Sequence, residues 1–172
     1  MGNPEPLADA AGSRLGDPPC HVASDQILAA ARSWLGTPWR HQGRLKGVAV
    51  DCGGLILGVG KELGLLDFDT RAYGRIPDGQ QLRALCEQHL CRKHIGGLAS
   101  SSEAVGQAIM PGDVLLLRFT RHPQHLAIVG DRSAPFSLIH AYADAGACVE
   151  HGADVKWLRR IVAAYRFKQP TT

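Results

Sequence analysis

The sequence predicts an α+β fold in which N-terminal helices pack on an antiparallel β-sheet of about five strands. Apolar residues recur at helical spacing in the first half of the chain, and short strand-like runs follow from Met110 onwards. The chain has 172 residues, of which 45% are hydrophobic and 20% charged, as in an ordinary globular domain. We therefore predict a single domain over residues 23–169. A flexible arm over residues 1–22, rich in Pro, Gly, Ala and Asp, precedes it.

Three helices are predicted in the first half. The first covers residues 24–36, with its opening serine as N-cap and a glycine at its end. The second begins at Asp51 or Cys52 and ends near Gly64, and its leucine, isoleucine and valine residues share one face. The third covers residues 79–94 and follows a Pro-Asp-Gly turn.

The second half is predicted to form the sheet. Turn residues separate successive apolar runs at the spacing of hairpins and short loops, which favours antiparallel pairing. The five predicted strands lie within residues 110–119, 124–131, 136–144, 147–153 and 159–167.

Charge and cysteine content restrict the class of protein. A formal net charge of +3, with no run of like charges, gives no indication of nucleic-acid binding. The odd number of cysteines does not suggest a disulfide framework, so we expect folding in a reducing compartment. The sequence shows neither a signal-peptide core nor an apolar run long enough to span a membrane, which predicts synthesis in the cytoplasm. The cysteines are Cys20, Cys52, Cys86, Cys91 and Cys148.

Cys52 is the candidate nucleophile, because it stands where the second helix begins. Unpaired N–H groups and the positive end of the helix dipole are expected to favour its thiolate there. Gly53 and Gly54 leave room for a substrate backbone, Asp51 can cap the helix, and the Cys52 N–H can bind an oxyanion. The alternative is a small buried cysteine that serves only packing.

Two histidines are candidate partners of this thiol. His125 stands near the start of an apolar strand, and His140 has a comparable place on the next strand. Adjacent antiparallel strands could bring the two side chains together, so that His140 orients the His125 imidazole. Each histidine could instead be a structural residue with satisfied hydrogen bonds. The catalytic hypothesis requires the Cys52 sulfur to lie within bonding reach of His125.

The motifs together resemble those of the NlpC-type cysteine peptidases. The resemblance rests on ARSWLGTPWRHQG before the nucleophile, DCGGLI around it, MPGDVLLLR at the first strand, and HLAIVGD followed by LIHAYADAG. It covers residues 27–167, and the motif sequences are most similar to those of the branch found in phage tails.

The resemblance implies a fold and an activity. Members of this family have a papain-like α+β core with the nucleophile at the N-terminus of a central helix, and they cleave peptide stems of bacterial peptidoglycan. It implies Cys52 as nucleophile, His125 as base and His140 as the orienting third residue. The expected bond is γ-D-glutamyl–diaminopimelate, and no metal or cofactor is implied. The phage-tail branch implies phage tail proteins as partners and delivery to the cell wall in a tail or a related particle.

Two departures from the family pattern stand near the expected site. Many members have a tyrosine before the nucleophile that helps to bind the oxyanion, whereas Trp39 stands at the matching place here. His41 is a candidate substitute, so oxyanion or substrate binding is assigned to Trp39, His41, Asp51 and Gly53. Residues 68–109 are longer than the compact core needs, and we predict an additional helix and loop near the cleft.

Other interpretations remain open at this point. The same core could support a different amide or ester hydrolase, such as a lipid acyltransferase-like thiol enzyme, or a structural module of tail assembly with little activity. The run CEQHLCRKH resembles a metal site, but on a helix Cys91 points about 140° away from Cys86, and the zinc spacing is missing. We therefore predict no metal site.

Overall fold

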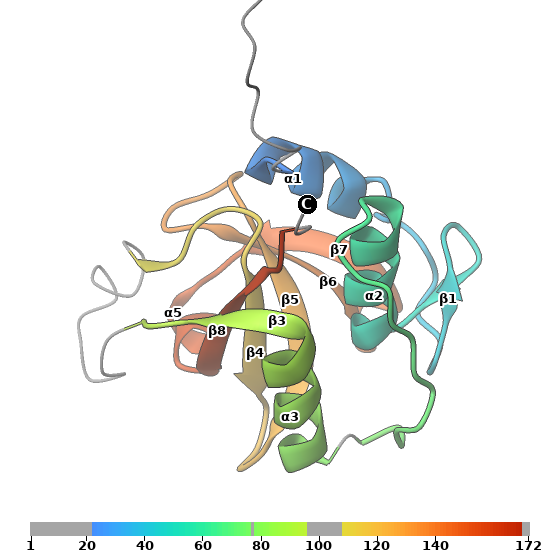
Figure 1. Cartoon of the computed structure of the whole chain (residues 1–172). Helices are drawn as coiled ribbons and strands as arrows, with labels where there is room; N and C mark the ends of the chain where they lie inside the picture. Colours follow the sequence, from blue (N-terminus) through green and yellow to red (C-terminus); the bar gives the residue numbers. More distant parts are fainter. Residues whose placement is uncertain (1–21, 77, 96–107, 170–172) are drawn as a thin grey trace, which may run out of the picture.

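The computed structural model describes residues 22–76, 78–95 and 108–169 (Figure 1). Most of the predicted arm, including Cys20, and part of the predicted insertion lie outside these described residues. The helices are α1 (Ser24–Arg32), α2 (Cys52–Glu62), α3 (Gly79–His89) and the short α5 (Val155–Leu158). Among the described residues, no helix combines the length and apolar character that crossing a lipid bilayer requires.

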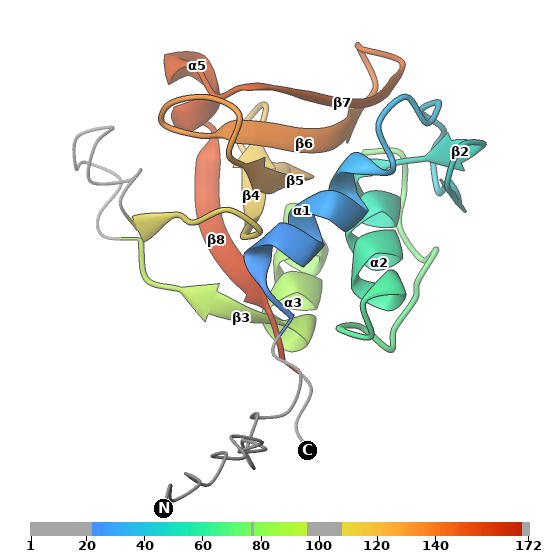
Figure 2. The same ribbon diagram turned by 90° about the horizontal axis from the view of Figure 1, so that it is seen from above.

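A six-stranded antiparallel sheet forms the centre of the molecule (Figures 1 and 2). Its strand order is β3-β8-β4-β5-β6-β7. The strands are β3 (Leu90–Lys93), β4 (Val114–Arg118), β5 (Pro123–Gly130), β6 (Ser137–Tyr142), β7 (Ala147–Gly152) and β8 (Ile161–Phe167). A separate two-stranded hairpin, β1 (Arg44–Leu45) and β2 (Ala49–Val50), leads directly into α2. The predicted α+β class is confirmed, with six strands in place of about five.

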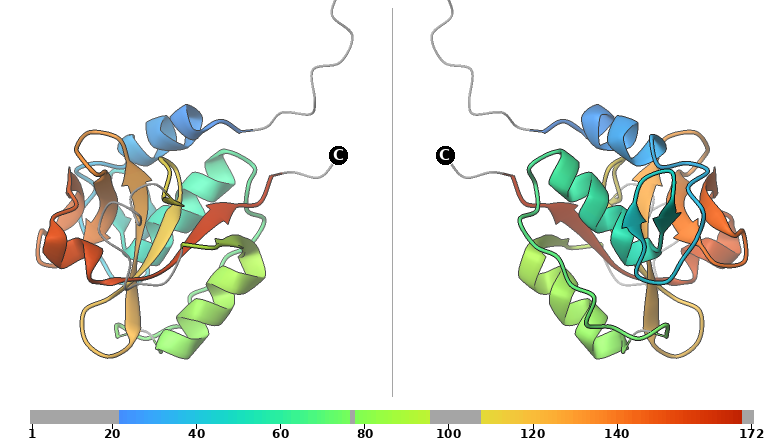
Figure 3. Two further views of the ribbon diagram at one scale, coloured as in Figure 1. Left: turned by 90° about the vertical axis from the view of Figure 1, so that its left-hand side faces the viewer. Right: turned by 90° about the vertical axis from the view of Figure 1, so that its right-hand side faces the viewer.

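Alternation along the strands divides the apolar residues between the two faces of the sheet. One face packs against α1 and α2, whose buried residues include Ile27, Leu55 and Val59. The other face packs with Trp157 and Leu158 of the α5 segment. Figure 3 shows α2 lying between α1 and α3, so that α2 is the central helix of its layer. This arrangement holds the start of α2 against β5 and β6.

The ends of the first helix differ slightly from the prediction. Ala23 occupies the N-cap position in place of Ser24, and its N–H donates to the Gln26 side chain at 2.9 Å. The helix ends at Arg32, before the predicted end at Gly36. Gly36 has a φ of +80°, a left-handed value that glycine adopts readily, and it lies in the following turn. The N–H of Gly36 donates to Cys148 at 2.9 Å, which ties this turn to β7.

The third predicted helix is too long by one turn. Helix α3 ends at His89, and the next residues form β3, which pairs with β8 through Leu90 and Phe167. The free edge of β8 offers backbone hydrogen bonds to this segment, and Leu90 reaches the core with 4% of its surface exposed. Tertiary pairing therefore outweighs the helical propensity of these residues.

Candidate active site

Cys52 is the first residue of α2, as predicted. Asp51 is the N-cap, and its side chain accepts a hydrogen bond from the Gly54 N–H at 2.7 Å. Strands β5 and β6 pair from Ile128 and Ile139 towards the C-terminus of β5, so the part of β5 that carries His125 and Leu126 lies before the paired residues. The backbone N–H of Leu126 on β5 lies close enough to the Cys52 sulfur to lower its pKa.

The ionisation of Cys52 differs from the prediction. Burial of the sulfur, assisted by the negative charge of Asp51, raises the pKa of the thiol to about 11. The N–H groups of Leu126, Gly53 and Cys52 itself act in the opposite direction but do not outweigh burial. The N–H groups at the helix start thus favour the thiolate, as predicted, but burial outweighs them and leaves the thiol as the favoured form of Cys52 near neutral pH.

The structure brings His125 and His140 together. The Nε2 atom of His125 lies 2.7 Å from Nδ1 of His140, and the two residues are 5% and 0% exposed. Burial lowers the pKa of His125 to about 3 and that of His140 to about 2, so both rings are neutral at rest. Within the described chain, no hydrogen bond joins the Cys52 sulfur to His125, so the contact that the catalytic hypothesis requires would have to form when substrate binds. The sulfur instead lies beside the backbone of Leu126, the residue that follows His125.

A third histidine continues the pair, and the sequence analysis did not identify it. His151 on β7 places its Nε2 atom 2.9 Å from Nε2 of His140, and its Nδ1 atom 2.9 Å from the Gly152 carbonyl oxygen. The ring of Trp157 packs against His140 and His151, with centroid distances of 5.1 and 5.0 Å. Alternation along the predicted fourth strand places Val149 and His151 on one face, but only the register of β6 and β7, in which Val149 lies opposite His140, brings His151 to His140.

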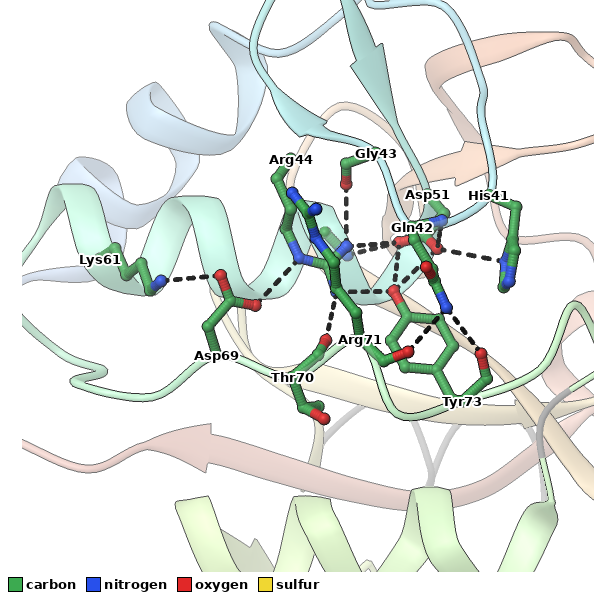
Figure 4. Close-up of polar contacts among 11 residues, drawn as sticks. His41, Gln42, Gly43, Arg44, Asp51, Lys61, Asp69, Thr70, Arg71 and Tyr73 are labelled. Atoms are coloured by element: carbon green, nitrogen blue, oxygen red, sulfur yellow. Dashed lines mark hydrogen bonds and ion pairs between the residues drawn. The ribbon is translucent and has the colours of Figure 1, made fainter.

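A second polar network surrounds Asp51 at the start of α2 (Figure 4). The Tyr73 hydroxyl donates to Asp51 at 2.9 Å and accepts from Arg44 at 2.6 Å, while Arg44 also donates to Asp51 at 3.1 Å. The Gln42 N–H adds a hydrogen bond of 2.6 Å to the same carboxylate. Tyr73 comes from the predicted insertion, in a segment without sequence pattern, so no sequence signal could have found it. The network fixes the turn that presents Cys52.

The predicted oxyanion residues have different positions. His41 directs its Nδ1 atom towards Asp51 at 3.8 Å, and its ring lies edge-on to Tyr73. Trp39 is half-buried, and its ring packs under the Arg75 guanidinium at 5.4 Å. Gly53 faces the Tyr73 hydroxyl, which lies 3.5 Å from the place of an added methyl group. His41, Asp51 and Gly53 thus surround the start of α2 together with Tyr73.

An apolar pocket opens beside Cys52, between α2 and α3. Its walls are mainly aliphatic side chains, and the polar residues Thr70, Tyr73, Asp78, Gln81 and His89 also line it. The His89 Nε2 atom is buried without a hydrogen-bond partner in the described chain, and its ring stacks on Phe68 with a centroid distance of 3.8 Å. The apolar walls come from Ile56, Leu57, Leu66, Phe68, Leu82, Leu85, Leu90 and Leu126.

The run CEQHLCRKH is divided between two elements. Cys86 is buried in α3, where it also lines the pocket, whereas Cys91 is exposed on β3. The described residues contain no group of three or more His, Cys, Asp or Glu side chains placed to hold a metal ion.

The chain is similar to known proteins in its three-dimensional structure. No family model and no curated protein sequence matches the chain. It is similar to an NlpC/P60 family protein from Bacillus cereus, with a TM-score of 0.55 and 17% identity over 84% of this chain and 40% of the other. It is also similar to the NlpC/p60 domain of the peptidoglycan hydrolase SagA, with a TM-score of 0.52 and 17% identity over 84% of this chain and 98% of that domain.

An N-acetylmuramoyl-L-alanine amidase from Bacteroides uniformis has a TM-score of 0.57 at 13% identity, over 85% of this chain and 99% of the other. The chain spans less than half the length of the Bacillus cereus protein and of a Staphylococcus aureus NLP/P60 family protein, 40% and 46% respectively. At these identities the likeness concerns the fold. The chain has the papain-like α+β fold of NlpC/P60 proteins, as the sequence motifs predicted.

Proposed function

We propose that this chain is a cysteine peptidase that hydrolyses amide bonds in peptidoglycan stem peptides. The buried hydrogen bond between His125 and His140 carries the proposal, because it orients an imidazole on the strand that also contacts the Cys52 sulfur. Two proteins of similar fold support it by their names: SagA is called a peptidoglycan hydrolase, and the Bacteroides uniformis protein is called an N-acetylmuramoyl-L-alanine amidase. The γ-D-glutamyl–diaminopimelate bond is the proposed target, as the motif resemblance implies.

The proposed reaction begins from a neutral thiol and a neutral base. The Cys52 proton passes to Nδ1 of His125 while the sulfur attacks the amide carbonyl, so that no resting thiolate is needed. The Cys52 N–H at the start of α2 binds the developing oxyanion. His125 then gives its proton to the leaving amine as the C–N bond breaks. Water, activated by His125, hydrolyses the resulting thioester and frees the thiol.

The test is incubation of the purified protein with peptidoglycan, followed by mass analysis of the released fragments. We expect soluble stem-peptide fragments whose masses identify the cleaved bond. The Cys52→Ala variant should release none above the background without enzyme, because no other group in the site replaces the sulfur. Equal release by both proteins would exclude Cys52 from the mechanism.

A second candidate function is acyl transfer by the same thiol from a lipid or another apolar acyl donor. The apolar pocket beside Cys52 favours it, because a pocket of this kind suits an acyl chain more than a charged stem peptide. A fatty-acyl thioester separates the two functions. Rapid acylation of Cys52 by this thioester, without release of peptidoglycan fragments, would favour acyl transfer.

Delivery by a phage tail is a separate proposal, supported only by the motif resemblance. Copurification of the protein with purified phage or phage-like particles of the source strain would test it. Its absence from such particles would contradict this mode of delivery and leave the proposed chemistry unaffected.

A further inference from the structure

The hydrogen bonds of the three histidines determine where their protons lie. The Gly152 carbonyl can only accept, so Nδ1 of His151 carries a hydrogen. If all three rings are neutral, each has one N–H, and Nε2 of His151 then accepts from Nε2–H of His140. By the same argument, Nδ1 of His140 accepts from Nε2–H of His125. The remaining nitrogen, Nδ1 of His125, is left with a free lone pair.

We propose that His151 is a positioning residue that sets the tautomers of His140 and His125, so that His125 presents an unprotonated Nδ1 to Cys52. One part of this proposal rests on the proposed function, namely that Nδ1 of His125 takes the Cys52 proton during the reaction. The tautomers themselves do not depend on it. Without the acceptor on His151, His140 could donate to His125 through Nδ1. His125 would then accept at Nε2 and carry its hydrogen on Nδ1, where it could not take the thiol proton.

The same chain offers a path for positive charge. When Nδ1 of His125 takes the thiol proton, its Nε2 proton can move to Nδ1 of His140, and the Nε2 proton of His140 can move to Nε2 of His151. Each ring gains one proton and loses one except His151, which becomes the imidazolium opposite the Cys52 thiolate. Burial opposes a charge on His125 and His140, whereas His151 is half-buried, and its Nδ1–H already donates to a carbonyl.

The surroundings of His151 keep this geometry in place. His140 contacts it from β6, and Trp157 contacts both rings from α5. The Arg160 guanidinium lies over Trp157 and Phe119, and its positive charge lowers the pKa of His125 together with burial. Arg160 therefore also disfavours an imidazolium at His125, which is consistent with moving the charge towards β7.

Long-range proton–nitrogen NMR spectra of the ¹⁵N-histidine-labelled protein test the tautomers directly. We expect Nε2–H for His125 and His140 and Nδ1–H for His151. An Nδ1–H tautomer at His125, or an Nε2–H tautomer at His151, would overturn the proposal. This readout needs no substrate, so it separates the proposal from any failure of the peptidase assignment.

Two variants test the role of the acceptor in catalysis. His151→Leu removes it, and we expect kcat to fall by about tenfold or more with KM little changed, since only the proton transfer is impaired. His151→Gln offers a carbonyl oxygen near the same place and should retain most of the rate. His94→Leu is the matched control for the loss of an imidazole, since His94 is exposed and directly follows β3. Equal kcat values for His151→Leu and His151→Gln would contradict the proposal.

Discussion

At the scale of single residues, the protonation of Cys52 decides how the site works. A papain-like site can begin from a thiolate and an imidazolium, but here burial and Asp51 hold the sulfur as a thiol. Burial likewise holds His125 as a neutral ring. A neutral pair avoids an uncompensated buried charge in the resting protein. In the proposed reaction, the substrate and the three histidines then assist the transfer of the thiol proton.

Alkylation measures this protonation. The thiolate is the reactive form, so the rate of Cys52 labelling by iodoacetamide should rise about tenfold per pH unit until the pH approaches its pKa of about 11. Peptide mapping by mass spectrometry separates Cys52 from Cys91, which is exposed and serves as the internal reference. Faster labelling of Cys52 than of Cys91 at neutral pH would show that the sulfur is more ionised than its burial implies.

The sequence identifies the centre of the site more readily than its surroundings. Cys52 could be placed because glycines and a capping aspartate mark the start of its helix, and His125 and His140 because they interrupt apolar strands. Tyr73 could not be placed, since it reaches Asp51 from a segment without regular structure. The contact of His151 with His140 depends on the register of β6 and β7, in which His140 lies opposite Val149. The sequence of a single strand does not determine that register.

At the scale of elements, the start of α2 depends on close contact with the β1–β2 hairpin. Gly54 lies in the first turn of the helix, and a methyl group there would overlap the Gly43 carbonyl and crowd the Arg44 guanidinium. The same approach lets Asp51 bind both the helix N–H of Gly54 and the hairpin side chain of Arg44. Gly54, the second glycine of the DCGGLI motif, thus has a packing role in addition to its place near the sulfur.

Replacement of Gly54 tests this packing. Gly54→Ala should lower the free energy of unfolding by about 2 kcal/mol or more, because the hairpin must move away from the helix. Gly53→Ala is the matched control, since its methyl group would meet the Tyr73 hydroxyl at an ordinary 3.5 Å and alanine is the better helix former. Urea unfolding of both variants gives the comparison. An equal loss of stability in both would contradict the contact with Gly43.

Element boundaries were predictable only where local pattern and tertiary contacts agree. The start of α2 satisfies both, with its N-cap at Asp51 and its apolar face on the core. Strand β3 agrees only with its tertiary contacts, since the composition of residues 90–93 suits a helix. The free edge of β8 is a property of the assembled sheet, so the sixth strand could not be read from the sequence.

At the scale of the whole molecule, one buried ion pair joins α1 to the far part of the sheet. Arg32 of α1 donates to both carboxylate oxygens of Glu150 on β7, at 3.0 and 2.8 Å. The Glu150 side chain is 4% exposed and also accepts from Ser137 on β6 at 2.7 Å. Arg132 is the third partner of Glu150, at 3.1 Å. This cluster fixes the helical layer to the strands that carry His140 and His151.

The ion pair makes the stability of the molecule depend on pH. Burial alone would raise the pKa of Glu150, but the hydrogen bonds from Arg32 and Ser137, with the positive charge of Arg32, lower it below its ordinary 4.5. A carboxyl whose pKa is lowered on folding stabilises the folded state above its unfolded pKa. That stability is lost as the pH falls through the folded value. The contribution of Glu150 is therefore complete at neutral pH and disappears in acid.

Removal of the arginine should expose this dependence. Arg32→Met keeps much of the side-chain volume, but it leaves Glu150 buried with only Ser137 and the exposed Arg132 as partners. We expect a loss of about 2 kcal/mol in the free energy of unfolding at neutral pH, less than for a fully abandoned buried charge. The loss should shrink as the pH falls through the ordinary carboxyl pKa of 4.5 towards the lowered pKa of the folded wild type, because Glu150 and the second carboxylate bound by Arg32, Asp131, then bind protons in both proteins. Urea unfolding across this pH range measures both quantities.

An exposed ion pair provides the control for the buried one. Lys46 and Glu62 form a contact of 2.7 Å, but their side chains are 34% and 36% exposed. Lys46→Met should therefore lower the free energy of unfolding by less than about 1 kcal/mol at any pH.

The Arg32 stem also packs on the sheet, so lost packing is the competing explanation for a destabilised Arg32→Met. Packing does not titrate. A deficit of equal size in acid and at neutral pH would assign the effect to the lost stem and exclude the charge of Glu150 as the link between helix and sheet.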